Sequence, residues 1–189
     1  MYDIRYVYIR CLRNFIMQFR KHLHTTIHER YYIMISDEIK NIKEFMSKLL
    51  ISDCFDNYFV TDITITTFNT FHIDGHIKKD FFSSEEYEEA GSPSLSTWKM
   101  LKKYCYDIIK GKKTPLNFKI IFMMPEDIVS QIINQNNLSI APSNITGLFV
   151  NIKYDNGHLT YTTGTSLNIL ELDKSTEKAF DKHIVSTLS

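Results

Sequence analysis

The chain has 189 residues, of which 43% are hydrophobic, and its 22 basic side chains balance its 22 acidic ones. This length accommodates one domain with a sizeable core, or two small ones. The zero formal net charge argues against binding of nucleic acid through bulk electrostatics, although it is compatible with a local basic patch. Because no apolar run approaches the roughly 20 residues that cross a bilayer, we predict a cytoplasmic protein that does not contact a membrane.

The three cysteines, Cys11, Cys54 and Cys105, are far apart and form no C-x-x-C pair. This pattern favours reduced thiols over a disulfide scaffold or a zinc site. The sequence also lacks G-x-S-x-G, a glycine-rich phosphate loop and H-E-x-x-H, which are frequent signatures of catalytic sites. We therefore predict no catalytic residues and no cofactor, and we lean towards a protein that is not an enzyme.

Residues 1–32 differ from the rest of the chain because they are rich in arginine and also carry His22, His24 and His28. One interpretation is a basic arm for nucleic acid or an anionic membrane, and another is a histidine metal site. We favour a poorly ordered leader upstream of a natural start at Met34, because chain ends without an apolar period are commonly loose. The predicted organisation is a leader over residues 1–33 and a single domain over residues 34–189.

The central feature of the domain is residues 59–73, which alternate between an apolar side and a hydroxyl-rich side. This period of two predicts one long, half-buried strand. Asp74 and Gly75 are expected to form a tight hairpin turn after it, with Ile77 opening the returning strand. The acidic segment over residues 83–94 is predicted to be a solvated loop.

Apolar residues at helical spacing predict the helices, and the first of these has Asn41 as N-cap with Glu44 in capping-box position. Asn156-Gly157 is the strongest turn signal in the chain. The first half of the domain is predicted to hold a strand over 34–39, a helix over 41–50 and a helix that starts near 94 or 96 and runs to 110. The predicted elements that follow are a strand over 116–123 that is buried on both faces, a helix over 125–134, a strand over 147–154, a return strand that Gly164 breaks or bends, a strand over 167–172 and a helix from about 174.

The order strand, helix, strand, strand occurs twice, first from residue 34 and again from residue 116. We therefore predict an α+β fold, with a mostly antiparallel sheet, helices packed on one face, and two β-α-β-β units in tandem. This order resembles the repeated unit of sliding-clamp domains, the ring-forming processivity factors of DNA replication. The resemblance implies an oligomeric ring whose basic helices line DNA, but the predicted helix over residues 125–134 has no Lys or Arg.

Three segments resemble an uncharacterised family of small bacterial proteins, a domain of unknown function. They are ITTFNTFHIDG at residues 65–75, KGKKTPLNF at residues 110–118 and YTTGTSL at residues 161–167. The resemblance spans nearly everything from Met34 onward and leaves residues 1–32 outside it, which supports the leader interpretation. It implies no activity.

Hydroxyl and amide side chains gather on the two predicted hairpins. If the hairpins are neighbours in the sheet, these side chains form a polar, neutral surface for a ligand or a partner strand. The competing explanation is that threonine is a good strand former on a wet face. The candidate residues are Thr64, Thr66, Asn69, Thr162 and Thr165.

Lysines around the predicted helix over residues 96–110 form a candidate contact for nucleic-acid phosphates, with Tyr104 and Tyr106 as aromatic faces. Lysines off the buried face of an amphipathic helix are, however, ordinary. The candidate residues are Lys99, Lys102, Lys103, Lys110, Lys112 and Lys113.

His72, Asp74 and His76 bracket the predicted turn and are weak candidates for a metal site, because imidazole and carboxylate groups hold divalent ions. A turn between them would splay the side chains, so we predict an exposed polar tip without a metal. Taken together, the sequence predicts a non-catalytic binding or interaction module, clamp-like, that contacts nucleic acid, a protein partner or further copies of itself. The alternative is a small enzyme or metal-binding protein that uses these three residues.

Overall fold

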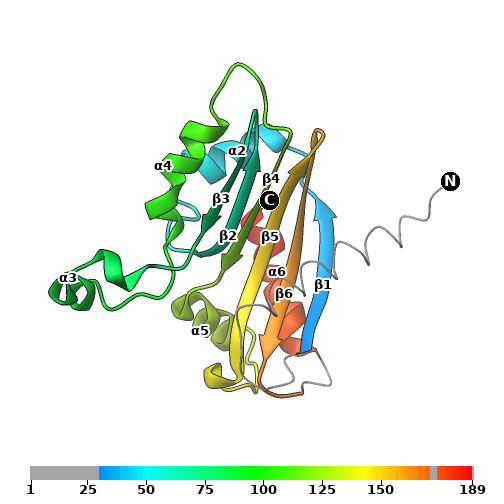
Figure 1. Cartoon of the computed structure of the whole chain (residues 1–189). Coiled ribbons are helices and arrows are strands. Elements are labelled where there is room, and N and C mark those ends of the chain that lie inside the picture. Colours follow the sequence, from blue (N-terminus) through cyan, green and yellow to red (C-terminus); the bar gives the residue numbers. More distant parts are fainter. Residues whose placement is uncertain (1–29, 171–173, 189) are drawn as a thin grey trace.

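The structure is a computed structural model that describes residues 30–170 and 174–188, with side chains from Ile35 onward (Figure 1). In this part of the chain, six strands form one sheet in the order β1-β6-β5-β4-β2-β3, with every neighbouring pair antiparallel. The strands are β1 (Arg30–Glu38), β2 (Phe59–Thr66), β3 (Thr70–Asp74), β4 (Asn117–Met123), β5 (Ile145–Asp155) and β6 (His158–Leu167).

The longer helices α2, α4, α5 and α6 pack on one face of the sheet (Figure 1). The fold class is therefore α+β with an antiparallel sheet and helices on one face, as the sequence predicts. The helical elements are α2 (Ile42–Leu50), the 3-10 helix η1 (Lys79–Phe81), α3 (Ser84–Glu89), α4 (Trp98–Ile109), α5 (Glu126–Gln135), the 3-10 helix η2 (Pro142–Asn144) and α6 (Ser175–Leu188).

The core between α4, α2 and the sheet is built on Trp98, which is fully buried. Its indole N–H donates a hydrogen bond to the carbonyl oxygen of Leu49 at 2.7 Å, so the buried polar group is paired. The ring also meets Phe122 of β4 edge-on, with the centroids 5.3 Å apart. These contacts fix the first turn of α4, and with it the segment that leads into the helix.

The predicted long strand over residues 59–73 is wrong, because it is two strands, β2 and β3, joined by a turn. The Thr67 N–H donates to the Asn69 carbonyl at 2.9 Å, and the Asn69 side chain accepts from the Thr70 N–H at 2.8 Å. Asparagine favours turns because its side chain bonds to the nearby backbone in this way. A strand as long as the predicted one would also exceed the roughly 3–10 residues that are usual.

The predicted turn at Asp74 and Gly75 is therefore wrong as well. Gly75 instead lies against β2, where its N–H donates to the Thr61 carbonyl at 3.2 Å. A Cβ atom at this position would lie 1.9 Å from the carbonyl oxygen of Val60, so the close approach of two backbones is what requires glycine. No return strand follows, and His76 forms only an isolated antiparallel bridge with Leu95.

The second predicted hairpin is confirmed. Asn156 and Gly157 have φ angles of 49° and 87°, which are the left-handed conformations of a type I′ turn. Of the predicted break or bend at Gly164, the break is wrong, because β6 continues through Gly164, which pairs with Phe149 of β5. The irregularity lies in the neighbouring strand β1 instead, between Ile33 and Ser36.

Both predicted units appear in the element order, as β1-α2-β2-β3 and β4-α5-β5-β6. They do not form two adjacent blocks of sheet, however, because β6, β5 and β4 lie between β1 and β2. The resemblance to a sliding clamp is therefore not confirmed. The first strand begins at Arg30, earlier than predicted, and the leader prediction otherwise falls on residues 1–29, outside the described residues.

Candidate interaction surfaces

The sheet face opposite the helices is largely polar. The register places Thr64 beside Lys119, and Lys119 beside Lys153. Of the predicted polar surface, Thr64, Thr66 and Thr162 share this face, as the strand register shows. These three residues therefore lie on one polar face, and their role in binding a ligand or partner stays a prediction.

The other two residues of that prediction lie elsewhere. Asn69 forms the turn between β2 and β3. Thr165 is 0% exposed and pairs with the buried Leu148 on the helix-covered face, so its place on the polar surface is wrong. The two hairpins are also not neighbours, because β4 lies between β2 and β5.

A charged cluster that the sequence did not indicate lies on the polar face. The Asp62 carboxylate is 2.7 Å from the Lys119 ammonium and 3.3 Å from Nδ1 of His72. The side chains of Asp62 and Lys119 are only 17% and 27% exposed. Alternation with a period of two places side chains of one strand on the same face. The contact between Asp62, His72 and Lys119 also requires that β2 pair with both β3 and β4.

The predicted metal candidates do not converge. His72 is directed to Asp62, whereas Asp74 contacts His76 at 2.6 Å and Lys78 at 2.7 Å. Partial burial raises the pKa of Asp74, but hydrogen bonds from Lys78 and His76 outweigh it and hold that pKa well below its usual value. Among the residues that the structure describes, no three His, Cys, Asp or Glu side chains gather as a metal site would require.

The predicted lysine patch divides into two parts. Lys102 turns inward, where its ammonium contacts the Asp56 carboxylate and donates to the Ser52 carbonyl at 2.7 Å. With 18% of its side chain exposed, Lys102 is a structural residue, and its place in a surface patch is wrong. The other lysines of the prediction are exposed, namely Lys99, Lys103, Lys110, Lys112 and Lys113.

Two apolar groups accompany the exposed lysines of α4: Tyr104, which the sequence analysis named as an aromatic face, and Met100, which it missed. Met100 is 50% exposed and Tyr104 is 63% exposed. They lie one helical turn apart, in a row beside the row formed by Lys99 and Lys103, because residues four apart share one side of a helix. We call these four residues the α4 outer face. Most of the helix's other apolar residues turn towards the core, so this apolar row lacks a counterpart within the described fold.

The most unusual surface is a segment that leaves the body of the molecule between β3 and α4. Residues 78–93, which we call the arm, carry η1 and α3 and stand away from the sheet and from α4 (Figure 1). The prediction of a loop over residues 83–94 is wrong for its first half, which is the helix α3. Ser83 and Glu86 form a complete capping box at its start, with hydrogen bonds of 2.8 and 3.2 Å.

The base of the arm is held by backbone hydrogen bonds between its two legs. The Ile77 N–H donates to the Ser94 carbonyl at 3.0 Å, and the Ser96 N–H donates to the Gly75 carbonyl at 2.8 Å. Ser96 also accepts from the Val60 N–H of β2 at 2.9 Å. The legs are thereby tied to each other and to the sheet, which fixes the direction in which the arm projects.

The arm has its own small aromatic cluster. Phe82 packs near Tyr87, with the ring centroids 6.3 Å apart, and the Tyr87 hydroxyl donates to the Pro93 carbonyl at 3.0 Å. The Lys79 ammonium lies 5.5 Å from the centroid of the Tyr87 ring. Phe81 meets the Phe82 ring edge-on, with the centroids 5.2 Å apart, yet 84% of its surface stays exposed.

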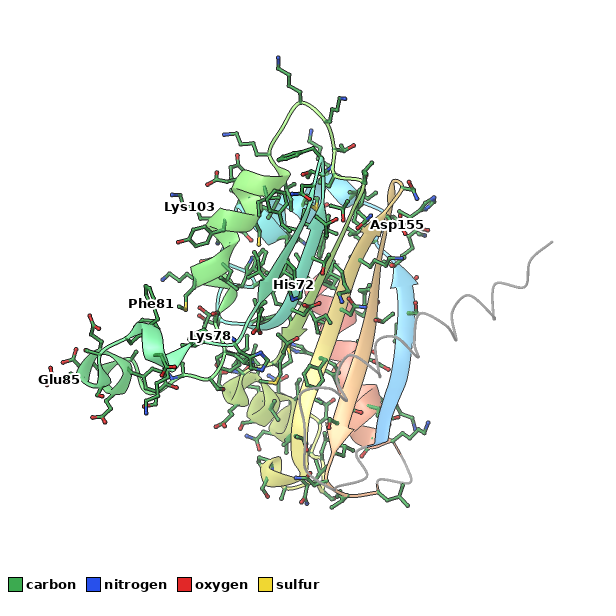
Figure 2. All side chains as sticks on the ribbon, in the orientation of Figure 1. His72, Lys78, Phe81, Glu85, Lys103 and Asp155 are labelled. Carbon is green, nitrogen blue, oxygen red and sulfur yellow. The ribbon has the colours of Figure 1, made fainter. Side chains whose placement is uncertain are left out.

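The charges that the arm presents to solvent are mainly acidic. Of its two lysines, Lys78 forms an ion pair with Asp74 and Lys79 forms a cation–π contact with the Tyr87 ring. Glu85, Glu88 and Glu89 are exposed and lie three or four positions apart, on one side of α3. Figure 2 shows Phe81 and Glu85 on the arm and Lys103 on α4. The arm is thus an ordered element that exposes both an aromatic ring and a row of carboxylates.

A cavity of about 240 Å³ lies where β1, α2 and α6 meet, and none of the predicted site residues lines it. It combines carboxylates and ammonium groups with the Tyr161 hydroxyl, and one of its ion pairs, between Lys48 and Glu44, spans 3.7 Å. Burial first, and then the nearby Asp37 and Asp181 carboxylates, raise the pKa of Tyr161. The mixed charges of this cavity indicate no particular ligand.

The two cysteines within the described residues are free thiols, as the sequence predicts. Cys105 lies in the core, where burial raises its pKa to about 12, and a thiol that stays protonated is a poor nucleophile. Across residues 30–170 and 174–188, no helix combines the length and the apolar content that crossing a membrane demands.

Comparison with known proteins places the chain in a family but adds no activity. No curated protein and no solved structure matches it. A family model matches residues 48–189, which include the arm, α4 and most of the sheet. This match covers most of the chain and agrees with the predicted resemblance to a domain of unknown function, while the bacterial origin stays a prediction. The chain therefore belongs to the family of unknown function DUF5721.

Proposed function

We propose that the protein is a non-catalytic interaction module of the cytoplasm that binds a protein partner through its arm. The observation that carries the proposal is Phe81, which is 84% exposed at the side of an otherwise ordered element. Its ring meets that of its chain neighbour Phe82 edge-on at 5.2 Å, and this single ring contact leaves most of the Phe81 surface open to solvent. Exposed aromatic anchors of this kind are enriched among residues that dominate protein interfaces.

The charges of the arm define the chemistry of that partner. Glu85, Glu88 and Glu89 offer carboxylates on one side of α3, and Phe81 of the same arm offers an apolar ring. A complementary surface must pair an apolar contact with basic side chains. The proposed partner is therefore a protein with a basic rim around an apolar patch.

Nucleic acid is a second candidate, because five of the six predicted lysines are exposed and Tyr104 lies among them. Contacts to phosphates would make retention of the protein on single-stranded DNA fall steeply with salt. The double substitution Lys112→Glu and Lys113→Glu should then weaken retention at low salt. Retention unchanged by that substitution would remove the lysines from consideration.

The rival function, a metal-binding protein or small enzyme that uses His72, Asp74 and His76, draws no support from the geometry. His72 and His76 contact different carboxylates. Metal analysis of the native protein, compared with the variant His72→Ala/His76→Ala, tests this rival directly. Equal metal content in both proteins would leave it without a site.

The test of the arm uses a photo-reactive phenylalanine analogue placed at position 81 in cells that make the protein. The matched control places the same analogue at Phe68, which is 93% exposed in the turn between β2 and β3. We expect a discrete protein adduct from position 81, absent from position 68. The adduct should disappear when Glu85, Glu88 and Glu89 are replaced by Lys. Adducts that are absent at position 81, or alike at both positions, would contradict the proposal.

A further inference from the structure

The described fold contains a surface with the chemistry that the arm requires. On the α4 outer face, the apolar row of Met100 and Tyr104 runs beside the basic row of Lys99 and Lys103. Both rows are open, with Met100 half exposed and Tyr104 63% exposed. Asp107, the next acidic residue, follows Lys103 by four positions and so continues the basic row by one helical turn.

The spacing of charges on the two surfaces also corresponds. Glu85 and Glu89 are four residues apart on α3, and Lys99 and Lys103 are four residues apart on α4. On any α-helix this separation places the Cβ atoms about 5–6 Å apart. The two carboxylates and the two ammonium groups therefore match as pairs, with Phe81 on one surface and the Met100–Tyr104 row on the other as the apolar contact.

The arm does not reach this face within its own chain. Figure 1 shows α4 beside the sheet and α3 at the far end of the arm, away from the sheet and from α4. The hydrogen bonds that tie Ile77 to Ser94 and Ser96 to Gly75 hold the base of the arm in this direction. An arm that is fixed away from its own α4 can meet only the α4 of another molecule.

We propose that the partner of the arm is a second copy of this chain, with the arm of one copy docked on the α4 outer face of the next. This inference rests on the proposed function and names its partner. The donor and acceptor surfaces are different, so the contact is head-to-tail, and repetition gives a closed ring or an open chain of subunits. The balanced total of 22 basic and 22 acidic residues is compatible with such pairing between copies.

Two charge-reversed full-length variants test the proposal. The arm variant carries Glu85→Lys, Glu88→Lys and Glu89→Lys, and the face variant carries Lys99→Glu and Lys103→Glu. All five positions are exposed, and circular dichroism verifies that each variant folds. Sedimentation velocity of the wild-type protein should show a mass that rises with protein concentration and falls with salt. Each variant alone should sediment as a monomer, because like charges then meet at the contact.

The decisive sample is the equimolar mixture of the two variants. The lysine arm of one variant faces the glutamate face of the other, and the remaining native arm faces the remaining native face, so assembly should return. Phe81→Ala should weaken wild-type association about tenfold or more, because a large apolar contact is lost. Phe68→Ala should leave it unchanged.

Three outcomes would overturn the inference: a wild-type monomer at every concentration, assembly that both reversals leave intact, or a mixture that stays monomeric. These outcomes are distinguishable from failure of the proposed function. If the wild-type protein is a monomer while position 81 captures a different basic protein, the arm is an interaction element and only the choice of partner is wrong. If position 81 captures nothing at all, both proposals fall.

Discussion

The helix-covered core and the arm both contain clustered aromatic residues, but the two regions use them differently. In the core, Phe122 is 0% exposed and contacts Phe55, Tyr58 and Trp98 at centroid distances of 5.9, 5.8 and 5.3 Å. In the arm, Phe81 remains 84% exposed although Phe82 next to it is packed. The core encloses its aromatic rings, whereas the arm leaves the Phe81 ring largely open to solvent despite its edge contact with Phe82. We infer that the core serves stability and the arm serves association.

The largest expected effect is on the core. Trp98→Ala should lower the free energy of unfolding by about 3–5 kcal/mol, because a fully buried ring is removed and the Leu49 carbonyl loses its donor. Phe81→Ala should change the same quantity by less than about 0.5 kcal/mol in the monomer. Urea unfolding followed by circular dichroism measures both. A loss of stability for Phe81→Ala that approached the loss for Trp98→Ala would contradict the division between the two regions.

Substitution of Gly75 at the base of the arm and of Gly91 in its outer part should have unequal effects on stability. Gly75→Ala should lower the free energy of unfolding by about 3 kcal/mol or more, because the new Cβ would meet the Val60 backbone at 1.9 Å. Gly91→Ala should cost only about 1 kcal/mol, because Gly91 has a φ of 78° but open space around it. Thermal and urea unfolding of the two variants should rank them in this order, and equal losses would mean that the base is not a rigid junction.

Lys102 and Lys103 are neighbours in the sequence of α4, but Lys102 is ion-paired with Asp56 and Lys103 is exposed on the α4 outer face. Lys102→Ala should destabilise the fold by about 1–2 kcal/mol, because it leaves the partly buried Asp56 carboxylate without its cation. Lys103→Ala should leave stability nearly unchanged, and we expect it to weaken association instead. A double-mutant cycle with Asp56→Asn isolates the ion pair. Coupling between Asp56 and Lys103 as large as that with Lys102 would contradict this assignment.

The smallest effect concerns Asp74, which anchors the start of the arm through His76 and Lys78. The pKa of Asp74 is lower in the folded protein than its unfolded value near 3.9. Its stabilisation is therefore present at neutral pH and is lost as the pH falls from about 5 through the lowered folded pKa. Since the carboxylate is 37% exposed, we expect Asp74→Asn to cost less than about 1 kcal/mol at pH 7.

The check on this prediction is unfolding as a function of pH. The difference in stability between wild type and Asp74→Asn should shrink steadily below about pH 4. The control Asp80→Asn removes an exposed carboxylate of η1 and should follow the wild-type curve. A difference that grew on acidification would reverse the sign and refute the role given to Asp74.

Local pattern in the sequence predicted much of the fold. The Asn41 cap of α2 and the turn at Asn156 and Gly157 form where predicted, because caps and type I′ turns depend on a few adjacent residues. The turn at Asn69 was missed because alternation of polar and apolar residues continues across it. The conformation of Gly75 depends on contact with Val60 of another strand, which no local pattern encodes.

The interaction surfaces were harder to predict because they depend on tertiary contacts. In the sequence, Lys102 and Lys103 both lie off the apolar stripe of α4. In the structure, Lys102 forms a partly buried ion pair with Asp56, whereas Lys103 is exposed. The sequence alone does not distinguish Phe81 from Phe82. Their rings contact each other, but Phe82 also meets Tyr87 and is the more buried of the two. Thr165 was placed with Thr162 from composition, although they face opposite sides of the sheet.

The most direct test of the central claim is the mass in solution of the wild-type full chain, measured by light scattering over a range of protein concentrations. The two charge-reversed variants and their mixture are measured in the same way. We predict a mass above that of the monomer for the wild type, monomers for the arm variant and the face variant alone, and a restored higher mass when the two are mixed. A wild-type protein that stays monomeric, or a mixture that does, would contradict the assignment of the arm to a second copy of the chain.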